Sequence, residues 1–356
     1  MAARNTLRRS LLYVPGSSQR FLDKSRSLTA DCLTYDLEDS VTPHKKAEAR
    51  SLVRRAIDQA APSGIRERAV RINSVDSGLA LADLTEVVSE FQFSQGRNTH
   101  ITRCFIFRFP PAPQPQHRLT KNHQLQSPNL TTIVIPKVNS ASDLTFVTDV
   151  INHTLSQQPQ VQRTPISLLA LIESAKSLTN LSQICAASPL LQGLIFAAED
   201  FALDLSITRT PSLTEFLFAR SAIATAARAA DLPSTIDLVC TAYKSEKGDG
   251  SPPAALQEEC RDGRRLGFNG KQCIHPSQVR VADEIFGPDP LETKWAMRVV
   301  IADEKAARAG RGAWTLDGKM IDVPVAHKAR AIVQKARACG VDVEALREEW
   351  QHQEPE

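Results

Sequence analysis

The feature that most constrains the fold is a series of short apolar segments, each followed by a longer stretch with helical periodicity. The apolar segments are 10–14, 32–38, 68–73, 131–137, 166–173, 193–200, 236–242 and 270–276. Intervening stretches such as 45–60 and 213–230 show the three- and four-residue spacing of amphipathic helices. Apolar strands separated by helices are typical of a parallel sheet covered by helices. We therefore predict an α/β fold, a (β/α)8 TIM barrel over 8–285, with a C-terminal helical extension over 286–350.

Length, charge and cysteine content narrow the class of protein. A chain of 356 residues is long enough for one large barrel domain. Its formal net charge of +3 is too small to indicate nucleic-acid binding. No apolar run approaches the ~20 residues that span a bilayer, so we expect no membrane partner. The seven cysteines are scattered, odd in number and never spaced as Cys-x-x-Cys, which indicates reduced thiols rather than disulfides or structural zinc.

The first residues bear on the cellular compartment. The start, MAARNTLRRSLLYVPG, is basic and free of acidic residues, as transit peptides are. The first strand-like segment, however, begins by Leu11, so that loss of a leader would cut close to the fold. We expect a cytoplasmic protein, with a mitochondrial or peroxisomal location as the alternative.

Polar side chains stand where the predicted strands end. In a (β/α)8 barrel the carboxyl ends of all strands meet at one rim, where the loops that carry active-site residues converge. A single charged residue after a strand usually caps a helix or lies in a solvated turn, but here the whole rim is polar. The residues at these ends are Pro15, Gly16, Asp36, Glu38, Asp39, Arg71, Asn73, Lys137, Glu173, Glu199, Asp200, Tyr243 and His275.

The carboxylates of this rim predict a bound cation. Clustered carboxylates repel one another unless a metal ion or a cationic group neutralises them. Oxygen ligands without neighbouring His or Cys suit Mg²⁺, which takes one or two protein carboxylates and completes its shell with water and substrate. Lys137 offers a different chemistry, because Schiff-base aldolases place a nucleophilic lysine of lowered pKa at the end of a barrel strand.

Seven motifs occur in an order that resembles a known enzyme family. They are RRSLLYVPGSSQRFLDK (8–24), YDLEDSV (35–41), VRINSVDSG (70–78), VIPKV (134–138), LIESA (171–175), AAEDF (197–201) and GFNGKQCIHPSQV (267–279). Together they are similar to the HpcH/HpaI aldolase/citrate lyase family and, within it, to the citrate lyase beta subunit-like branch, whose known member is a citramalyl-CoA lyase. The resemblance runs over about 8–336. It implies a Mg²⁺-dependent TIM barrel, usually a homotrimer, that cleaves or forms a C–C bond between a CoA thioester and a 2-oxo acid.

The resemblance also implies roles for individual residues. Glu173 and Asp200 match the two magnesium ligands, and Arg71 matches the arginine that faces the substrate carboxylate and oxyanion. Asp322, in LDGKMIDVP (316–324), matches an aspartate that reaches the active site of a neighbouring subunit; taken alone it would be an exposed turn residue. The residues that match the region holding the CoA nucleotide are Arg20, Lys24, Lys45, Lys46, Ile274, His275 and Pro276.

The substrate that the resemblance implies is a 3-hydroxyacyl-CoA with a carboxylate on the hydroxyl-bearing carbon, and these residue types suit its cleavage. The first expectation is citramalyl-CoA, giving acetyl-CoA and pyruvate. Mg²⁺ on Glu173 and Asp200 would act as a Lewis acid, and Arg71 would add a fixed bidentate cation. Asp322 would give a proton to the enolate carbon, or remove one in the condensing direction. The alternatives are malyl-CoA or citryl-CoA as the substrate, a malyl-CoA thioesterase, and a non-autonomous beta subunit of a citrate lyase complex.

Two rim residues receive secondary assignments. If 193–200 is a strand, Glu199 and Asp200 face opposite ways, so that only one of them meets the ion. The resemblance selects Asp200, and Glu199 would then orient a water molecule or pair with a cation. The family forms no imine at the position of Lys137, which disfavours the Schiff-base route.

Residues 91–130 interrupt the pattern. They contain no Asp or Glu and are enriched in Gln, Pro, Arg and His. A structureless stretch of this length is unusual inside a compact barrel. Two hypotheses compete: a loop that projects from the amino-terminal side of the barrel, and the translation of a retained intron, which sequencing the transcript across Glu90 to Thr131 would distinguish.

Overall fold

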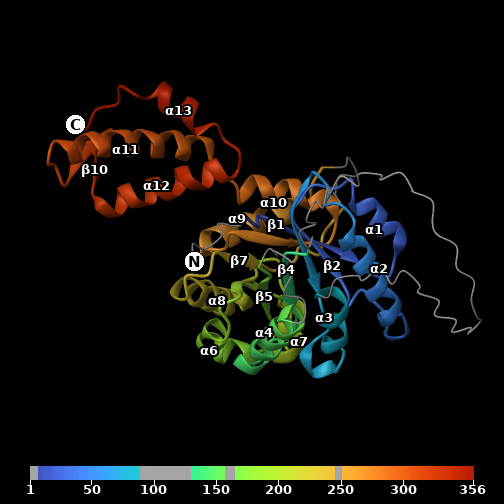
Figure 1. Cartoon of the computed structure of the whole chain (residues 1–356). Coiled ribbons are helices and arrows are strands. Elements are labelled where there is room, and N and C mark those ends of the chain that lie inside the picture. The colour runs from blue at the N-terminus through green and yellow to red at the C-terminus, as the bar shows by residue number, and fades with distance from the viewer. Residues whose placement is uncertain (1–6, 89–129, 157–164, 245–250) are drawn as a thin grey trace, which may run out of the picture.

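The structure, a computed structural model, describes residues 7–88, 130–156, 165–244 and 251–356. Eight described strands run parallel and close into one barrel in chain order (Figure 1). They are β1 (Ser10–Pro15), β2 (Ala30–Asp36), β3 (Ile65–Arg71), β4 (Thr132–Ile135), β5 (Ser167–Ile172), β6 (Leu191–Phe196), β7 (Ser234–Asp237) and β8 (Gly270–Cys273). Each overlaps one predicted segment, so the predicted (β/α)8 barrel is confirmed. The insertion predicted at 91–130 lies, apart from Leu130, outside the described residues.

The barrel closes where the short, glycine-containing strand β8 meets β1. Ser10 and Leu11 are in register with Lys271 and Gln272. A Cβ atom at Gly270 would lie 2.0 Å from the carbonyl oxygen of Arg8, so only glycine fits this close approach of two backbones. The glycine that makes β8 difficult to recognise as a strand therefore also allows the barrel to close.

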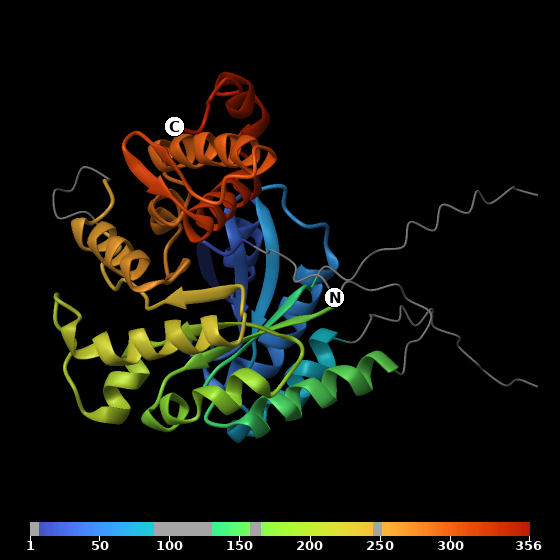
Figure 2. The ribbon, with the colours of Figure 1, turned by 90° about the vertical axis from the view of Figure 1, so that its left-hand side faces the viewer.

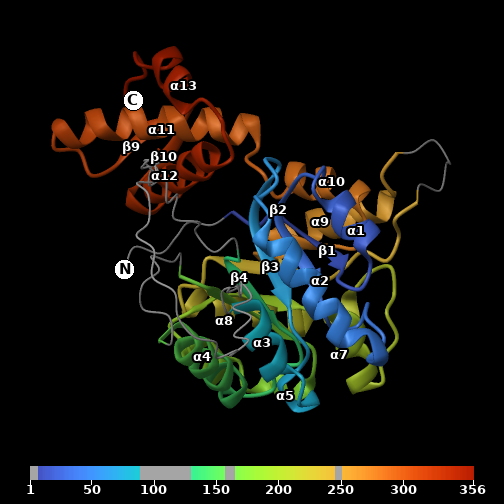
Figure 3. The same cartoon turned by 45° about the vertical axis from the view of Figure 1, so that its right-hand side comes forward.

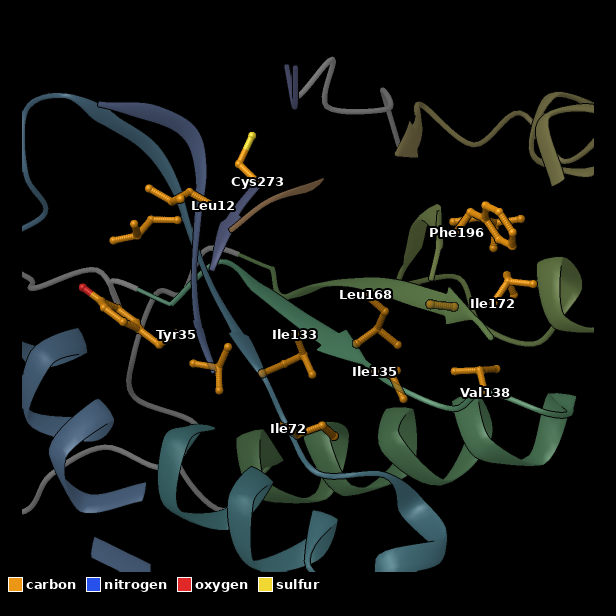
Figure 4. Close-up of a cluster of buried hydrophobic side chains, with 14 of the residues drawn as sticks. Leu12, Tyr35, Ile72, Ile133, Ile135, Val138, Leu168, Ile172, Phe196 and Cys273 are labelled. Carbon is orange, nitrogen blue, oxygen red and sulfur yellow. The ribbon is translucent and has the colours of Figure 1, made fainter. Parts of the chain in front are cut away.

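The strands are apolar because both of their faces are buried. Inside the barrel a small cluster fills the interior; its members are Leu11, Cys32, Ala69, Val134, Leu169, Leu171, Ile195 and Ile236. A much larger cluster lies between the strands and the surrounding helices. Figure 4 shows part of this outer layer, where Ile133, Ile135 and Val138 stand between the sheet and the helices. This packing leaves the strand ends and their loops as the places for polar chemistry.

Helices follow the strands around the barrel. They are α1 (Gln19–Ser25), α2 (Lys46–Asp58), α3 (Ala80–Val88), α4 (Ala141–Ser156), α5 (Ala175–Thr179), α6 (Leu181–Ala186), α7 (Ala198–Leu205), α8 (Leu217–Ala229), α9 (Ala254–Leu266) and α10 (Val279–Ile285). Local sequence explains several of their ends. Ser174 caps α5 by a capping box with Ser177, and Gly267 ends α9 with a φ of 100° that glycine adopts without strain. The helical stretches predicted at 45–60 and 213–230 contain α2 and α8.

The predicted strand 193–200 is wrong at its carboxyl end. β6 stops at Phe196, and Glu199 and Asp200 lie in the first turn of α7. Two adjacent carboxylates are favourable at a helix amino terminus, where the helix dipole is positive. Neighbouring helical residues point about 100° apart rather than to opposite faces, so the alternation argument for choosing between Glu199 and Asp200 does not apply.

The extension after the barrel contains a hairpin as well as helices. Its elements are α11 (Pro290–Arg308), β9 (Trp314–Leu316), β10 (Lys319–Ile321), α12 (Val323–Ala338) and α13 (Val343–Glu349). It has its own core, in which Val299, Trp314 and Leu316 are buried. Figures 1, 2 and 3 show it beside the barrel, beyond α10. Arg66, near the start of β3, donates to the carbonyl of Ala338 at 3.0 Å, so this contact is at the amino ends of the strands.

None of the helices in the described ranges combines the length and apolar character needed to cross a bilayer. The six cysteines within those ranges are free thiols, in agreement with the expectation of reduced cysteines.

Candidate active site

Charged side chains from successive strands meet at the carboxyl rim of the barrel. Asp36 ends β2 and is in register with Arg71, which ends β3. Glu173 directly follows β5, and Asp200 lies in the first turn after β6. Lys137 follows β4 by two residues. The parallel closed sheet therefore gathers at one edge the residues that were selected from the sequence.

Arg71 is fixed by Asp36. Its Nε and one terminal nitrogen donate to the two carboxylate oxygens at 2.7 and 2.8 Å. Its guanidinium also stands 4.8 Å from the centre of the Tyr13 ring. Burial would raise the pKa of Asp36, but the hydrogen bonds and charge of Arg71 lower it, so the pair is ionised. The remaining terminal nitrogen lies 3.1 Å from Glu38 and 3.3 Å from Asp39, and this edge of the guanidinium faces the rim.

Asp36 is a site residue whose role the sequence did not reveal. Besides holding Arg71, it accepts the main-chain N–H groups of Glu38 and Ser40 at 2.9 and 3.1 Å. Lys46 supports the same turn, because its ammonium donates to the carbonyls of Leu37 and Glu38 at 2.8 and 2.7 Å. The turn after β2 is therefore held from both sides, with the Glu38 carboxylate aimed at Arg71.

Glu173 and Glu38 are buried carboxylates with unsatisfied oxygens. Glu173 is 4 % exposed, and neither of its oxygens has a hydrogen-bond partner of normal geometry among the described residues. Burial raises its pKa to about 8, and repulsion from Glu38 and Asp200 adds to the rise. One oxygen of Glu38 also lacks a hydrogen bond of normal geometry in the described structure, but it is ion-paired with Arg71 at 3.1 Å. Burial raises the pKa of Glu38 to about 7, with Arg71 opposing and Asp39 reinforcing the rise.

Such unsatisfied oxygens fit a hard divalent cation. An ionised carboxylate that is buried without a partner is strongly unfavourable, and a metal ion supplies the missing charge and coordination. In the described ranges no group of three or more His, Cys, Asp and Glu side chains is arranged to hold a metal ion. Mg²⁺ does not require such a group, because it takes one or two protein carboxylates and fills its octahedron with water and substrate oxygens. Glu173, with Asp200 beside it, fits this kind of site.

Asp200 is positioned by its helix. Asp204, one turn further along α7, accepts the main-chain N–H of Ala175 at 2.8 Å. This bond ties α7 to the turn that begins at Glu173. Glu199 points elsewhere: it is 53 % exposed and accepts a hydrogen bond from Arg209 at 2.5 Å. Of the two roles expected for Glu199, orienting a water molecule or pairing with a cation, the structure shows the pairing.

Lys137 is held as an ammonium ion in a left-handed backbone conformation. Its φ is 51°, a conformation that non-glycine residues adopt uncommonly and that often marks functional sites. Its Nζ lies 3.5 Å from Glu38. Burial lowers its pKa, but the nearby carboxylates of Glu38, Asp39, Asp200 and Glu173 outweigh this and raise it. A Schiff-base nucleophile needs a lowered pKa, so this environment opposes that route.

The residues predicted to hold the CoA nucleotide lie on the loop after β8, on α1 and at the start of α2. Strands β8 and β1 are adjacent, so the loop with Ile274, His275 and Pro276 lies next to the loop that leads into α1. Arg20 and Lys24 are exposed on α1, and Lys45 is exposed before α2. The His275 ring lies 5.4 Å from that of Tyr243, which is 45 % exposed. Lys46 differs from the others, since its ammonium is engaged with main-chain carbonyls.

Asp322 does not lie at the rim of its own barrel. It directly follows β10 in the extension, and it caps α12 by accepting the N–H of Val325 at 3.1 Å. Figure 1 shows β10 at the part of the extension remote from the barrel. The structure therefore brings together Arg71, Glu173 and Asp200, but not Asp322, within one chain.

Comparison with known proteins gives consistent matches. The profile of the family described as HpcH/HpaI aldolase/citrate lyase matches residues 9–94 and 108–276. Human mitochondrial citramalyl-CoA lyase is 31 % identical over 337 residues, covering 92 % of this chain and 85 % of that protein. A (3S)-malyl-CoA thioesterase of Cereibacter sphaeroides is 33 % identical over 330 residues, covering 93 % of this chain and 95 % of that protein. Among solved structures, the chain is similar to CitE from Mycobacterium tuberculosis in complex with magnesium, acetoacetate and coenzyme A. The TM-score is 0.63 at 24 % identity, and the match covers 94 % of this chain and 99 % of that chain.

Proposed function

The chain belongs to the HpcH/HpaI aldolase/citrate lyase family, and from this premise we propose that it is a magnesium-dependent acyl-CoA lyase that cleaves citramalyl-CoA to acetyl-CoA and pyruvate. The observation that carries the proposal is Glu173, a buried carboxylate with two unsatisfied oxygens beside Asp200 and the guanidinium of Arg71. The name of the human relative supplies the substrate, and the CitE structure, which holds magnesium and coenzyme A, supports both groups.

Glu173 and Asp200 are the proposed magnesium ligands. When bound, the ion supplies Lewis-acid stabilisation of negative charge on oxygen as the C–C bond breaks. Arg71 has a complementary role: Asp36 occupies one edge of its guanidinium. The remaining terminal nitrogen, which lies 3.1 Å from Glu38 and 3.3 Å from Asp39, faces the rim and would bind and orient the substrate carboxylate. A lysine could not hold Asp36 and the substrate with the same fixed geometry.

Proton transfers fall to carboxyl groups. Cleavage requires the substrate hydroxyl to lose its proton, while the electrons of the C–C bond pass to the thioester enolate. Glu38 is our candidate to accept the hydroxyl proton, since its pKa of about 7 suits a general base at neutral pH. Asp322 then gives a proton to the enolate carbon, which completes acetyl-CoA.

The position of Asp322 supports a homotrimer in which it acts on a neighbouring subunit. It is exposed in the extension and remote from its own rim. Met320 and Val323, on either side of it, are 72 % and 57 % exposed. Apolar side chains at an exposed tip suit burial against another chain. Domain 286–350 would in this way complete the active site of a second copy.

The nucleotide of coenzyme A is proposed to lie over the adjacent β8 and β1 loops. Arg20, Lys24 and Lys45 provide exposed cations for its phosphates, and Ile274, His275 and Pro276 provide a wall. Lys46 is part of the same proposal only if its ammonium leaves the carbonyls that it now binds.

The test is an activity screen of the purified full chain with citramalyl-CoA, malyl-CoA and citryl-CoA, with Mg²⁺ and with EDTA. Release of acetyl-CoA and pyruvate from citramalyl-CoA, abolished by EDTA, supports the proposal. Preferred cleavage of malyl-CoA or citryl-CoA changes the substrate but not the reaction. Release of free CoA from malyl-CoA favours a thioesterase, the activity named for the Cereibacter relative. Absence of turnover with every thioester would favour a non-autonomous citrate lyase subunit.

The mitochondrial designation of the human relative favours the mitochondrial alternative over the cytoplasm. The basic, acid-free start of the chain agrees with that location. Microscopy of the full chain with a carboxyl-terminal fluorescent tag would test it: co-localisation with a mitochondrial marker supports the proposal, and diffuse fluorescence contradicts it.

A further inference from the structure

We propose that Arg209 is a positioning residue that holds Glu199 and thereby sets the orientation of Asp200 toward the metal ion. The inference rests on the proposed function, because it takes Asp200 as a magnesium ligand. It assigns a purpose to the carboxylate next to Asp200 and to an arginine that none of the seven motifs contains.

Arg209 contacts three separate elements. One terminal nitrogen donates to Glu199 at 2.5 Å. The other donates to the carbonyl of Val239, which follows β7, at 3.1 Å, and to Glu259 of α9 at 2.8 Å. A single planar guanidinium thus connects the first turn of α7 with the loop after β7 and with α9.

The far end of this connection is anchored in the protein interior. Glu259 uses its second oxygen to accept from Lys271 of β8 at 2.8 Å, and Lys271 is fully buried. A buried ammonium must keep its counter-charge, so Glu259 is constrained by Lys271 as well as by Arg209. The Arg209 side chain is itself only 16 % exposed. The guanidinium is therefore a fixed point against which α7 can be placed.

The first turn of α7 needs such a fixed point. The helix has eight residues, and the methyl side chain of its N-cap residue, Ala197, cannot accept a hydrogen bond from the first turn. Ala198, Phe201 and Ala202 pack the helix into the core. Two polar side chains add tethers to it: Asp204 binds the N–H of Ala175, and Glu199 binds Arg209. Asp200 lies between these two tethers. Loss of the Arg209 tether would remove the polar contact that orients the end of the helix carrying the proposed ligand.

The contact contributes more to geometry than to stability. Glu199 is 53 % exposed, and exposed ion pairs contribute only about 0–1 kcal/mol to folding. Groups that orient a metal ligand have a larger effect on the metal, since their removal typically lowers metal affinity or activity by about 10–100-fold. The two roles are therefore separable by measuring metal affinity and unfolding on the same variants.

The test compares R209A, R209K and E199Q with the wild-type full chain. Mg²⁺ affinity is measured by calorimetry, and folding is checked by circular dichroism. The values of kcat and KM for the acyl-CoA are measured at saturating Mg²⁺. We expect R209A to lose about 10–100-fold in Mg²⁺ affinity while KM for the acyl-CoA changes little. R209K should also lose affinity, because one ammonium cannot hold Glu199, Glu259 and Val239 together. E199Q should stay near wild type, because the amide oxygen still accepts from Arg209.

The control is R265A, which removes an arginine of α9 that is 62 % exposed and bonded to Glu258. Its Mg²⁺ affinity should equal that of the wild type. A folded R209K variant with wild-type Mg²⁺ affinity overturns the inference. If R209A fails to fold, the Mg²⁺ affinity of R209K alone tests the inference. A loss in E199Q as large as in D200A would make Glu199 a ligand rather than a tethered neighbour, and would also overturn it. A wild-type chain that binds no Mg²⁺ refutes the proposed function itself.

Discussion

Replacing Glu173 by glutamine should make the stability of the metal-free protein less dependent on pH. The pKa of Glu173 is raised from 4.5 to about 8 by burial and by the neighbouring carboxylates. The folded state therefore holds a proton that the unfolded chain releases, and stability falls as the pH rises from 4.5 toward 8. Above about pH 8 the full cost of ionising the buried carboxylate is present.

The size of this cost follows from the pKa. Each tenfold change in proton affinity corresponds to ~1.4 kcal/mol, which limits the contribution of Glu173 to about 5 kcal/mol. Part of the rise is repulsion from Glu38 and Asp200, and Glu38 can relieve it by binding a proton itself. We therefore expect the wild type to lose about 1–3 kcal/mol more than E173Q between about pH 6 and pH 9. Comparing slopes with pH cancels the constant cost of burying the amide.

The assay is urea unfolding in EDTA at the two pH values. E349Q is the control, since Glu349 is 49 % exposed and should leave the wild-type slope unchanged. Saturating Mg²⁺ at about pH 9 should restabilise the wild type but not E173Q, because only an intact site binds the ion in the folded state. Equal loss of stability in the wild type and E173Q on raising the pH would refute the reasoning, since Glu173 would then be ionised at no cost.

Three further predictions concern the same rim. D200A should lower Mg²⁺-dependent turnover at least about a thousandfold, because Lewis-acid stabilisation contributes several kcal/mol. E199Q, in contrast, should retain Mg²⁺ binding when this is measured by calorimetry. Equal loss of Mg²⁺ affinity in both variants contradicts the assignment of Asp200 as the ligand. Borohydride treatment with pyruvate should leave Lys137 unmodified by mass spectrometry, because its raised pKa keeps it protonated, and an adduct would restore the Schiff-base route. Mixed trimers of inactive D322N and inactive E173Q should regain part of the wild-type activity, and mixtures without activity would contradict action of Asp322 across subunits.

The barrel could be predicted because its signal is repeated. Each apolar segment is buried on both faces, so its composition reports on the strand without knowledge of its neighbours. Strand ends are harder, as the boundary after Phe196 shows: Ala197 and Ala198 continue the apolar run, although alanine favours a helix over a strand. The two acidic residues after these alanines favour the start of a helix, because they interact with the positive end of the helix dipole. An apolar pattern does not contain this signal.

The hairpin of the extension was missed although its turn has a local signal. Asp317 and Gly318 have φ values of 50° and 70°, as a two-residue type I′ turn requires, and Asp-Gly is a favoured pair there. The strands on either side have three residues each, which is too short to show alternation. Turn chemistry alone would have been enough to predict the hairpin that precedes Asp322.

The partnerships within the rim could not be predicted, because they depend on register and on side chains far apart in the chain. Asp36 meets Arg71 only because β2 and β3 pair in one register, which no spacing along the sequence reveals. Arg209 lies in the loop after α7 and bonds to Glu259, which is fifty positions further along the chain. Arginine and glutamate in loops and helices are usually solvated, so composition gives no reason to single out these two.

The role of Glu199 could be predicted only in part from the sequence. Its place beside Asp200 was visible in the sequence, and the choice of Asp200 as the ligand came from family resemblance rather than from strand geometry. The structure replaces the strand argument with a different one: the first helical turn separates the two carboxylates in direction, and Arg209 takes one of them. A paired Glu199 adds no unpaired negative charge to a rim where burial already raises the pKa of Glu173 and Glu38. The arrangement therefore concentrates the uncompensated charge on the carboxylates proposed to face the ion and the substrate, which is where a divalent cation gains most from binding.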